Sequence, residues 1–335
     1  MSTITLTPSN ISFDTLPNEP VLMAAKRQNL NLPHSCQSGN CGACKATVVS
    51  GSFNMGDYKE RALSAEERTQ GKVLLCQTTA TEDMVVSMPE FLGADAPQVK
   101  TFPVRVKAID IRADVAVLQL ALPANNQFTF WPGQYLDVLL KDNQTRSYSI
   151  ATAPSQSEFI ELHIRQQPDG LFSNIVFGGL QEKAIFRVKA PLGTFTLAKD
   201  SHKPKIFMAT GTGFAPIKSM LQSLIDTSIN EKITVYWGAR SLNGLYDLAA
   251  AQALIAQLPN ATLIPVLSQA PETDAWQGRT GYIQDAVLTD FTDLSDYEVY
   301  ACGSPSMIEA AQLKLTVEGK LATDAFYADA FTPSV

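Results

Sequence analysis

The stretch His34-Ser-Cys-Gln-Ser-Gly-Asn-Cys-Gly-Ala-Cys44 decides how the first part of this chain folds. It carries Cys36, Cys41 and Cys44, and Cys76 follows after a gap of 31 residues. The pattern C-x4-C-x2-C with a distant fourth cysteine is the spacing with which thiolates hold a plant-type [2Fe-2S] cluster. The sequence therefore predicts a centre for one-electron transfer, with these four cysteines as metal ligands.

A structural zinc site and a disulfide framework are the alternative uses of four cysteines. Zinc sites usually combine two C-x2-C pairs or mix cysteine with histidine, whereas this chain has one such pair, with His34 as the nearby histidine. Disulfides need an oxidising compartment, and the chain opens without the basic and apolar segments of a signal peptide. We therefore expect a cytoplasmic protein with thiolates free to bind iron. Gly39 and Gly42 would let the loop backbone bring N–H groups near the cluster sulfurs.

Composition bounds the remaining possibilities. A length of 335 residues predicts two or three globular domains, and no apolar run approaches the ~20 residues of a membrane span. The net charge of −7 argues against nucleic-acid binding, which requires clustered basic side chains. Residues 1–95 carry ten acids and seven bases, so an acidic surface here either steers a basic partner protein or simply keeps the protein hydrated.

The hydrophobic pattern changes twice along the chain and predicts three domains. Residues 1–93 fit a small β-grasp domain, and the Gly/Pro/Ala-rich residues 94–100 fit a linker. Residues 101–200 show short alternating strands separated by turn signals, as in an antiparallel barrel. In residues 201–335 strands alternate with helices, as in a parallel nucleotide-binding sheet.

The individual elements expected in these domains follow from the same patterns. In the first domain we expect strands at 4–13, 45–51 and 84–88 and a helix at 21–29. In the barrel we expect strands at 104–108, 115–120, 135–140, 159–164 and 185–188. In the last domain we expect strands at 206–209, 233–237 and 297–301, with helices at 216–225 and from Ser304.

Arg146-Ser147-Tyr148-Ser149 closes a predicted barrel strand and suggests a flavin site. The arginine can neutralise a diphosphate through its fork of donors. The tyrosine can pack against the isoalloxazine ring, and the Ser149 hydroxyl can bond the ring near its reactive nitrogen. A surface arginine beside a core tyrosine is the alternative, but the position within a barrel that follows an iron–sulfur module favours FAD.

Gly170-Leu171-Phe-Ser173 is a second candidate flavin element. Gly170 allows a tight entry, and Ser173 near a helix start can join backbone N–H groups in binding a phosphate. An ordinary serine cap remains the alternative. The preceding strand residues His163-Ile164-Arg165 would then run along the cofactor, although an isolated histidine also fits a plain barrel position.

Gly211-Thr212-Gly213-Phe-Ala-Pro216 follows an apolar strand and opens a helix, the context in which glycines let the backbone approach a pyrophosphate. Pro216 occupies the third glycine position of the dinucleotide fingerprint, and no acid ends the next strand, so a full Rossmann dehydrogenase is disfavoured. Arg240 follows that strand and either contacts the adenosine ribose or a 2′-phosphate or lies free on the surface.

Cys302-Gly303-Ser-Pro305 ends the last clear parallel strand in the sequence. A small thiol here can lie beside the nicotinamide ring, because ligands of parallel sheets bind at the carboxyl edge. The alternative is that Cys302 is a small buried residue.

Together these motifs resemble the ferredoxin-reductase superfamily of iron–sulfur flavoproteins, in the branch with an N-terminal plant-type ferredoxin domain. The resemblance covers nearly the whole chain and is strongest with the CDP-6-deoxy-Δ3,4-glucoseen reductase-like group and with oxygenase reductase components. It is carried by three stretches and by the ending Phe326-Tyr-Ala-Asp-Ala-Phe331; the stretches are Arg146-Ser-Tyr-Ser-Ile-Ala-Thr-Ala-Pro154, Pro191-Leu-Gly-Thr-Phe195 and Gly211-Thr-Gly-Phe-Ala-Pro-Ile-Lys218. The resemblance implies that Phe331 lies near the flavin and that Asp329, where many relatives have Glu, lies near the hydride path.

The resemblance implies a multi-domain protein of α+β and α/β parts: a β-grasp ferredoxin domain, an antiparallel FAD-binding β-barrel and a parallel-sheet NAD(P)H-binding domain. NADH delivers two electrons and the cluster accepts one, so FAD is needed between them. We expect a monomeric reductase that uses NADH, with NADPH the alternative, and serves a separate oxygenase or dehydratase component. A stand-alone diaphorase or flavin reductase, and a non-catalytic redox carrier or sensor, are the competing hypotheses.

Overall fold

The computed structural model describes residues 1–331 except positions 8, 31, 35–36, 41, 61, 89–90, 92, 94–96, 98, 125–127, 142–143, 157 and 200. Cys36, Cys41 and most of the predicted linker lie outside the described residues. The chain forms two compact units, Met1–Val99 and Lys100–Val335. None of the helices in the described part of the chain is long and apolar enough to cross a membrane.

The first unit contains a mixed five-stranded sheet in the order β2-β1-β7-β3-β5, counted over its described residues. Strands β1 and β7 are parallel and the other neighbours are antiparallel. Buried side chains of α1 pack on the sheet in one apolar core, as expected for a β-grasp domain. The elements are β1 (Ser2–Thr7), β2 (Ile11–Thr15), α1 (Val21–Arg27), β3 (Lys45–Ser50), β4 (Phe53–Met55), α2 (Ala65–Thr69), β5 (Lys72–Leu74), β6 (Thr78–Ala80) and β7 (Met84–Ser87).

One prediction for this unit is wrong. The segment 4–13 was expected as a single strand, but it forms the hairpin of β1 and β2, with Ile4 paired to Phe13. Asn10 at the turn has a φ of 54°, a left-handed conformation that asparagine tolerates better than most residues. The alternation changes phase at the turn, from Ile4 and Leu6 to Ile11 and Phe13, and the Pro-Ser-Asn stretch between them is a turn signal that the expectation of one strand overlooked.

The first half of the second unit is an antiparallel sheet that closes into a barrel. Its order is β11-β10-β13-β8-β9-β12 over the described residues, and an antiparallel bridge between Ile150 and Leu162 links the two edges. The barrel core is aliphatic and aromatic, and α3 adds Phe172 and Val176 to it. The elements are β8 (Lys100–Arg112), β9 (Val115–Ala121), β10 (Tyr135–Leu139), β11 (Thr145–Ser149), β12 (Phe159–Arg165), α3 (Leu171–Phe177) and β13 (Ile185–Leu192).

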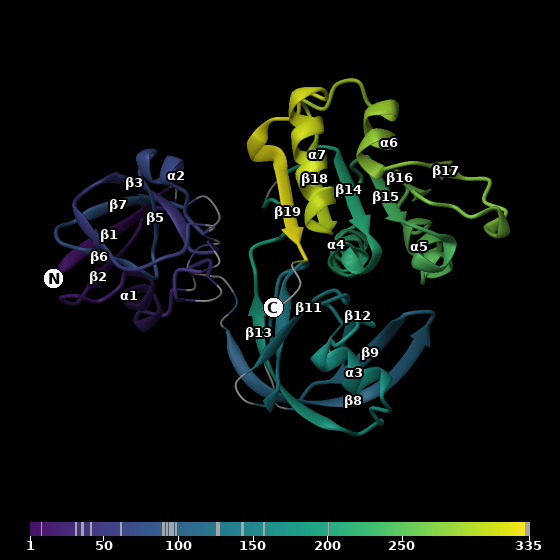
Figure 1. The fold of residues 1–335 in the computed structure, drawn as a ribbon, viewed down its shortest axis with the longest axis horizontal. Helices are drawn as coiled ribbons and strands as arrows, with labels where there is room; N and C mark the ends of the chain where they lie inside the picture. Colours follow the sequence, from purple (N-terminus) through teal and green to yellow (C-terminus); the bar gives the residue numbers. More distant parts are fainter. Residues whose placement is uncertain are drawn as a thin grey trace. The chain divides into compact units, whose positions relative to one another are not determined.

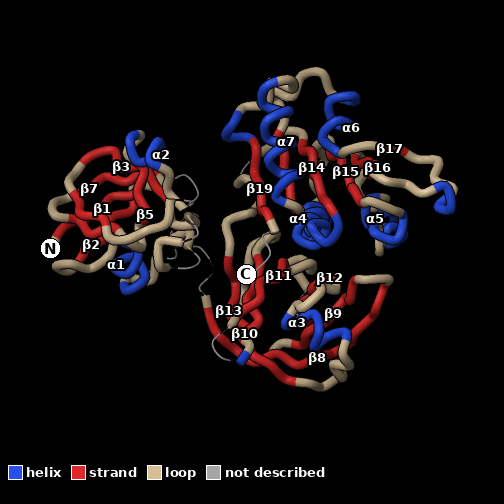
Figure 2. The backbone as a smooth tube through the Cα atoms, viewed as in Figure 1, coloured by secondary structure: helices blue, strands red, loops and turns tan. Residues whose placement is uncertain are grey.

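The second half is a parallel sheet in the order β17-β16-β15-β14-β18-β19 (Figure 1). Helices α4 and α5 pack in the apolar core on one face, and α6 and α7 pack in the core on the other. Figure 2 shows the alternation of strand and helix that builds this layered arrangement. The elements are β14 (Lys205–Thr210), α4 (Phe214–Asp226), β15 (Ile233–Ala239), α5 (Leu248–Ile255), β16 (Ala261–Leu267), β17 (Arg279–Thr280), α6 (Ile283–Asp290), β18 (Glu298–Gly303), α7 (Pro305–Val317) and β19 (Phe326–Ala330).

Three strands of this sheet were missed in the sequence, one of them the two-residue β17. β16 contains Pro265 and is only partly buried, and proline within a run argues against a strand. β19 is an edge strand that pairs with β18, so β18 is not the last parallel strand as we expected. Strand β14 has β15 on one side and β18 on the other, which places the topological switch point, where ligands of such sheets bind, between β14 and β18.

Candidate functional site

The two cluster cysteines that the structure describes lie in a suitable environment for a metal centre. Cys44 and Cys76 are 3% and 6% exposed. The pKa of Cys76 is lowered to about 6, chiefly by a hydrogen bond with the Cys44 side chain. Burial opposes this shift, and hydrogen bonds from the Gly39 backbone and the Gln77 side chain support it. Iron binds thiolates rather than thiols, so the donor set fits the predicted [2Fe-2S] cluster.

The glycines of the cysteine loop are required by its shape. Gly39 and Gly42 have φ values of 74° and 76°, which only glycine adopts without strain. A Cβ atom on Gly39 would lie 2.7 Å from the carbonyl oxygen of Asp57. The backbone of the loop is therefore packed closely against the segment that follows it, and the Gly39 N–H is directed at Cys76.

The predicted flavin motif ends at a hydroxyl that has no protein partner. Ser149 is 5% exposed, and its Oγ forms no hydrogen bond within the described residues. The Thr152 hydroxyl three residues later is also buried and unpartnered. Because buried polar groups are nearly always hydrogen-bonded, both hydroxyls fit a bound group that supplies acceptors or donors here. Thr152 was not among the residues singled out from the sequence.

The other residues of this motif lie as the alternation of β11 dictates. The Ser147 hydroxyl donates to Asp137 on β10 at 2.6 Å. Tyr148 packs against Phe172, with ring centroids 5.6 Å apart, and burial raises its pKa to about 12. Arg146 is partly buried and donates from Nη1 to the carbonyl oxygen of Thr145, so most of its guanidinium donors remain available for a ligand.

The second flavin element forms a tight turn at the start of α3. Ser173 is buried, and its hydroxyl donates to the carbonyl oxygen of Gly170 at 3.3 Å. A Cβ atom on Gly170 would lie 2.3 Å from that hydroxyl. The Ser173 side chain therefore holds the turn together, while Leu171 is 39% exposed at the first helical position.

The side chains of the three predicted residues on β12, His163, Ile164 and Arg165, have different surroundings. Ile164 is buried in the barrel core. The His163 side chain instead bonds to Tyr246 and Glu161. Arg165 makes an ion pair with Asp114 at 3.3 Å, yet its Nε and Nη2 atoms are buried without hydrogen-bond partners in the described chain.

Arg165 lies against the glycine turn of the parallel-sheet domain. A Cβ atom on Gly211 would be 3.3 Å from the Arg165 Nη2 atom, so a barrel residue and the predicted nucleotide loop meet. Unpartnered guanidinium nitrogens beside a glycine turn fit an anionic group such as a pyrophosphate. The contact between Arg165 and Gly211 could not be read from the sequence, and the same holds for the positions of Tyr246 and Thr152.

The glycine turn itself is a short 3₁₀ segment, Gly211–Gly213, between β14 and α4. A Cβ atom on Gly213 would lie 2.2 Å from the carbonyl oxygen of Cys302, so only glycine lets β18 approach this closely. Thr212 is partly exposed in the turn. Pro216 is the third residue of α4, where its missing N–H costs no intrahelical bond.

The ends of β18 and β19 complete the carboxyl edge of the sheet. Cys302 is fully buried, and burial raises the pKa of its thiol well above the usual value. Asp329 pairs with Cys302 in strand register, and burial raises the pKa of its carboxyl to about 6. The Phe331 N–H donates to the carbonyl oxygen of Gly303 at 2.8 Å. Pro305 begins α7, and Arg240 is exposed after β15.

The structure thus brings together Gly213, Cys302, Gly303, Asp329 and Phe331 at one edge, with Arg165 beside the glycine turn. Loop glycines, a helix start and a guanidinium with two unpartnered nitrogens fit the diphosphate of a nicotinamide nucleotide. Ser149 belongs to the barrel. The chain leads from the end of β11 to Thr152, whose carbonyl oxygen accepts a 2.6 Å hydrogen bond from Ser219 of α4.

Comparison with known proteins finds a matching domain model for each of three parts of the chain. Models of the 2Fe-2S iron-sulfur cluster binding domain, the oxidoreductase FAD-binding domain and the oxidoreductase NAD-binding domain match residues 4–81, 103–197 and 207–313. The CDP-6-deoxy-L-threo-D-glycero-4-hexulose-3-dehydrase reductase of Yersinia pestis is 38% identical over 332 residues, which cover 99% of this chain and 98% of that protein. The chain belongs to the iron–sulfur flavoprotein reductases.

Other reductases are similar to this chain over nearly its whole length. Reductase component 1 of the terephthalate 1,2-dioxygenase of a Comamonas species is 36% identical over 97% of this chain and 96% of its own length. The crystal structure of the Amycolatopsis cytochrome P450 reductase GcoB is 28% identical, with a TM-score of 0.79 and 99% of both chains covered. The predicted fold class and cofactor set, namely [2Fe-2S], FAD and NAD(P)H, are confirmed, and the chain is an NAD(P)H-dependent electron-transfer reductase.

Proposed function

We propose that this reductase passes electrons one at a time from NADH, through FAD and the [2Fe-2S] cluster, to a separate acceptor protein. The observation that carries the proposal is that one chain combines two buried cysteines, Cys44 and Cys76, the second with a lowered pKa, with a glycine turn that suits a nicotinamide nucleotide. A bound flavin supplies the chemistry between them, because it accepts two electrons as a hydride and gives them up singly.

We propose that the acceptor is a dehydratase or an oxygenase component. The relatives serve both classes, as the names of the hexulose dehydrase reductase and the terephthalate dioxygenase reductase state. Their identities of 38% and 36% do not favour one class over the other. We further propose that the protein is a monomer. The net charge of −7 argues against nucleic-acid binding, and a cluster held by thiolates favours a reducing cytoplasm.

The proposed flavin site uses both motifs of the barrel. Arg146 would neutralise the diphosphate, Tyr148 would pack against the ring, and Ser149 would direct its unpartnered hydroxyl to the ring edge. The backbone of Ser147 and of residues 163–165 would line the cofactor, since the side chains of Ser147 and His163 bond other protein groups and that of Ile164 lies in the barrel core. Gly170, Leu171 and Ser173 would present the start of α3 to a phosphate.

The proposed nicotinamide site lies at the switch point of the parallel sheet. Residues 211–213 and Pro216 would cradle the diphosphate beside Arg165, and Gly303 and Pro305 would shape the other wall. Cys302 and Asp329 would border the nicotinamide, and Phe331 would cover the flavin until the nicotinamide replaces it. Cys302 would act as a neutral thiol, because burial raises its pKa.

We propose NADH rather than NADPH as the donor. Arg240 lies on the loop after β15, and the Asp274 carboxylate accepts the Leu242 N–H on the same loop at 2.8 Å. A carboxylate that contacts this loop would repel the additional negative charge of a 2′-phosphate bound beside Arg240. The expected limits of the domains, 1–93, 101–200 and 201–335 with a linker at 94–100, remain part of the proposal.

The proposal is tested by anaerobic titration of purified protein with NADH and with NADPH. We expect iron and flavin in the protein, absorption bands from both, and bleaching of both bands at lower concentrations of NADH than of NADPH. Arg240→Ala should change the response to NADPH more than that to NADH. Colourless protein that contains zinc, or a cluster band that NADH never bleaches, would overturn the proposal.

A further inference from the structure

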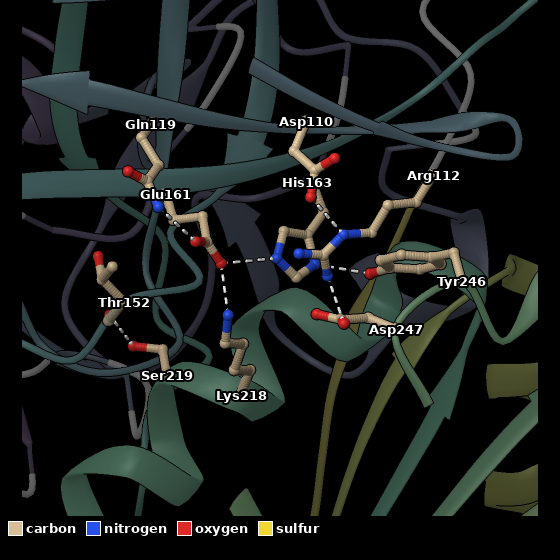
Figure 3. A network of polar contacts seen from close by, with 10 residues as sticks. All are labelled: Asp110, Arg112, Gln119, Thr152, Glu161, His163, Lys218, Ser219, Tyr246 and Asp247. Carbon is tan, nitrogen blue, oxygen red and sulfur yellow. Dashed lines mark hydrogen bonds and ion pairs between the residues drawn. The ribbon is translucent and has the colours of Figure 1, made fainter. Parts of the chain in front are cut away.

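A row of polar contacts crosses from the barrel to the parallel-sheet domain within the second unit (Figure 3). Glu161 on β12 accepts a 2.5 Å hydrogen bond from the Nζ atom of Lys218 on α4. The same carboxylate oxygen bonds His163 Nε2 at 2.9 Å, and His163 Nδ1 bonds the Tyr246 hydroxyl at 2.6 Å. Lys218, Glu161, His163 and Tyr246 therefore form one continuous network, which we call the interdomain network.

The protonation states in the interdomain network follow from its chemistry. Although burial opposes it, the hydrogen bond from His163 and the charge of Lys218 lower the pKa of Glu161 to about 2, so Glu161 is an anion that only accepts. Burial lowers the pKa of His163, so the ring is neutral at pH 7. Its Nε2 then donates to Glu161, and its Nδ1 accepts from Tyr246. Each donor has one acceptor, and the order of the contacts is fixed.

Both ends of the network attach to segments that carry proposed cofactor residues. Lys218 lies in the first turns of α4, directly after the Gly211–Gly213 turn. Tyr246 follows the loop of Arg240 after β15. On the barrel side, the carbonyl oxygen of Glu161 accepts from the N–H of Ala151 at 2.8 Å, two residues beyond Ser149.

Three of the four residues in the interdomain network are buried, and Lys218 is partly exposed, with 26% of its side chain accessible. His163, Glu161 and Tyr246 are 4%, 6% and 9% exposed. A buried ionic network seldom stabilises a fold more than apolar side chains of the same size would, but its directional bonds specify one geometry. A second pair across the same boundary, Arg112 with Asp247, lies directly after Tyr246. The bonds therefore restrict how the two domains can shift against each other.

We propose that Lys218, Glu161, His163 and Tyr246 are positioning residues that set the distance between the nicotinamide and the flavin. They hold the nucleotide cradle in register with the strand end that carries Ser149. Hydride transfer depends on donor and acceptor approaching within a few tenths of an ångström of the reactive distance. The inference rests on the proposed function, because it assumes that NADH reduces the flavin in this unit.

The test compares two single-atom changes. Tyr246→Phe removes the hydroxyl that bonds His163 and keeps the ring that packs on Trp237. Tyr236→Phe is the matched control, since Tyr236 is buried and its hydroxyl donates to Asp290 at 2.6 Å within the parallel-sheet domain alone. Each variant loses one tyrosine hydrogen bond, but only the first lies between the domains.

Three quantities are measured on the holoprotein: the rate constant of flavin reduction by NADH in a single turnover, the dissociation constant for NAD⁺, and amide hydrogen exchange of 212–226 and 239–247. For Tyr246→Phe we expect flavin reduction to slow by about tenfold, with NAD⁺ binding changed less than about threefold, and faster exchange in both segments. For Tyr236→Phe we expect the wild-type rate of flavin reduction and wild-type amide exchange in residues 212–226.

Glu161→Gln gives a second, independent variant, because it keeps the size of the side chain and removes the charge that holds Lys218 and His163. If it acts through the same network, its effect and that of Tyr246→Phe should be less than additive in the double variant. Wild-type reduction rates and exchange in both single variants would overturn the inference while leaving the proposed function intact. Failure of NADH to reduce the flavin in the wild-type protein would instead overturn the proposed function.

Discussion

Ser149→Ala should change the stability of the protein in opposite directions with and without flavin. The Ser149 hydroxyl is buried and has no partner in the described residues. A buried polar group without a partner costs about 1–3 kcal/mol, so its removal should stabilise the flavin-free protein by about 1 kcal/mol. In a domain of this size, 1 kcal/mol corresponds to a shift of about 2–4 °C in melting temperature.

With flavin bound, the same change removes a hydrogen bond to the cofactor. The expected loss of stability in the flavin-bound protein is about 0.5–1.5 kcal/mol. Together with the gain of about 1 kcal/mol in the flavin-free protein, this weakens FAD binding by about 1.5–2.5 kcal/mol, or roughly 10- to 70-fold. The assay is thermal unfolding of flavin-stripped and flavin-loaded protein, together with a fluorescence titration of the stripped protein with FAD. The melting temperature should rise in the stripped form, and the gain from added FAD should shrink.

Ser219→Ala provides the matched control for this experiment. Ser219 is fully buried, but its hydroxyl donates to the carbonyl oxygen of Thr152 at 2.6 Å. Its removal should lower the melting temperature of both forms by a similar amount, on the order of 1 kcal/mol. If Ser149→Ala destabilised the stripped protein as Ser219→Ala does, the Ser149 hydroxyl would have a partner in the protein, and the proposed contact with flavin would be refuted.

Three further predictions concern the carboxyl edge and the interdomain network. Burial raises the pKa of Asp329 from 3.8 to about 6, so between these pH values the folded state binds more protons than the unfolded state, and stability falls as pH rises. The expected fall is on the order of 2 kcal/mol in melting curves from pH 4 to 7, and Asp329→Asn should remove it. Burial lowers the pKa of His163 below 6.5, an effect that the charge of Lys218 supports and that Glu161 and Asp247 oppose. The wild-type protein should therefore lose stability as pH falls below 6.5, by at most about 1.4 kcal/mol per pH unit. His163→Gln should lose less stability per pH unit, and an equal loss would contradict a neutral His163 ring. Gly213→Ala would place a Cβ atom 2.2 Å from the Cys302 carbonyl oxygen, so NAD⁺ affinity should fall by at least about tenfold while iron and flavin content stay unchanged; unchanged affinity in a calorimetric titration would exclude this turn from the nucleotide site.

Local motifs were enough to predict the three domains and their cofactors. Cysteine spacing indicates the cluster without any knowledge of the fold, because four thiolates at this spacing serve few other purposes. The alternation of strand and helix after residue 205 similarly indicates a parallel sheet. The hairpin at Asn10 was missed because the change of phase between Leu6 and Ile11 was overlooked. The strand β16 was missed because Pro265 argues against a strand.

Contacts between segments distant in sequence could not be predicted in this way. Lys218 is 57 residues from Glu161, and Tyr246 is 83 residues from His163. In the sequence, Glu161 and His163 look like the polar positions of an ordinary half-buried strand. Glu161 and His163 are buried because α4 and the segment that carries Tyr246 pack against β12. This packing is visible only in the folded unit. Arg165 at the glycine turn is a similar case, although its place in the motif had already marked it as a candidate.

The central claim is that electrons leave this reductase through the cluster, and Cys76→Ser tests it most directly. The two activities to measure are NADH-dependent reduction of cytochrome c, which accepts single electrons, and of ferricyanide, which the flavin can reduce without the cluster. If the cluster lies on the path, the variant loses cytochrome c reduction, keeps ferricyanide reduction near the wild-type rate and retains its flavin. If cytochrome c reduction survives in protein shown by analysis to lack iron, the claim is contradicted.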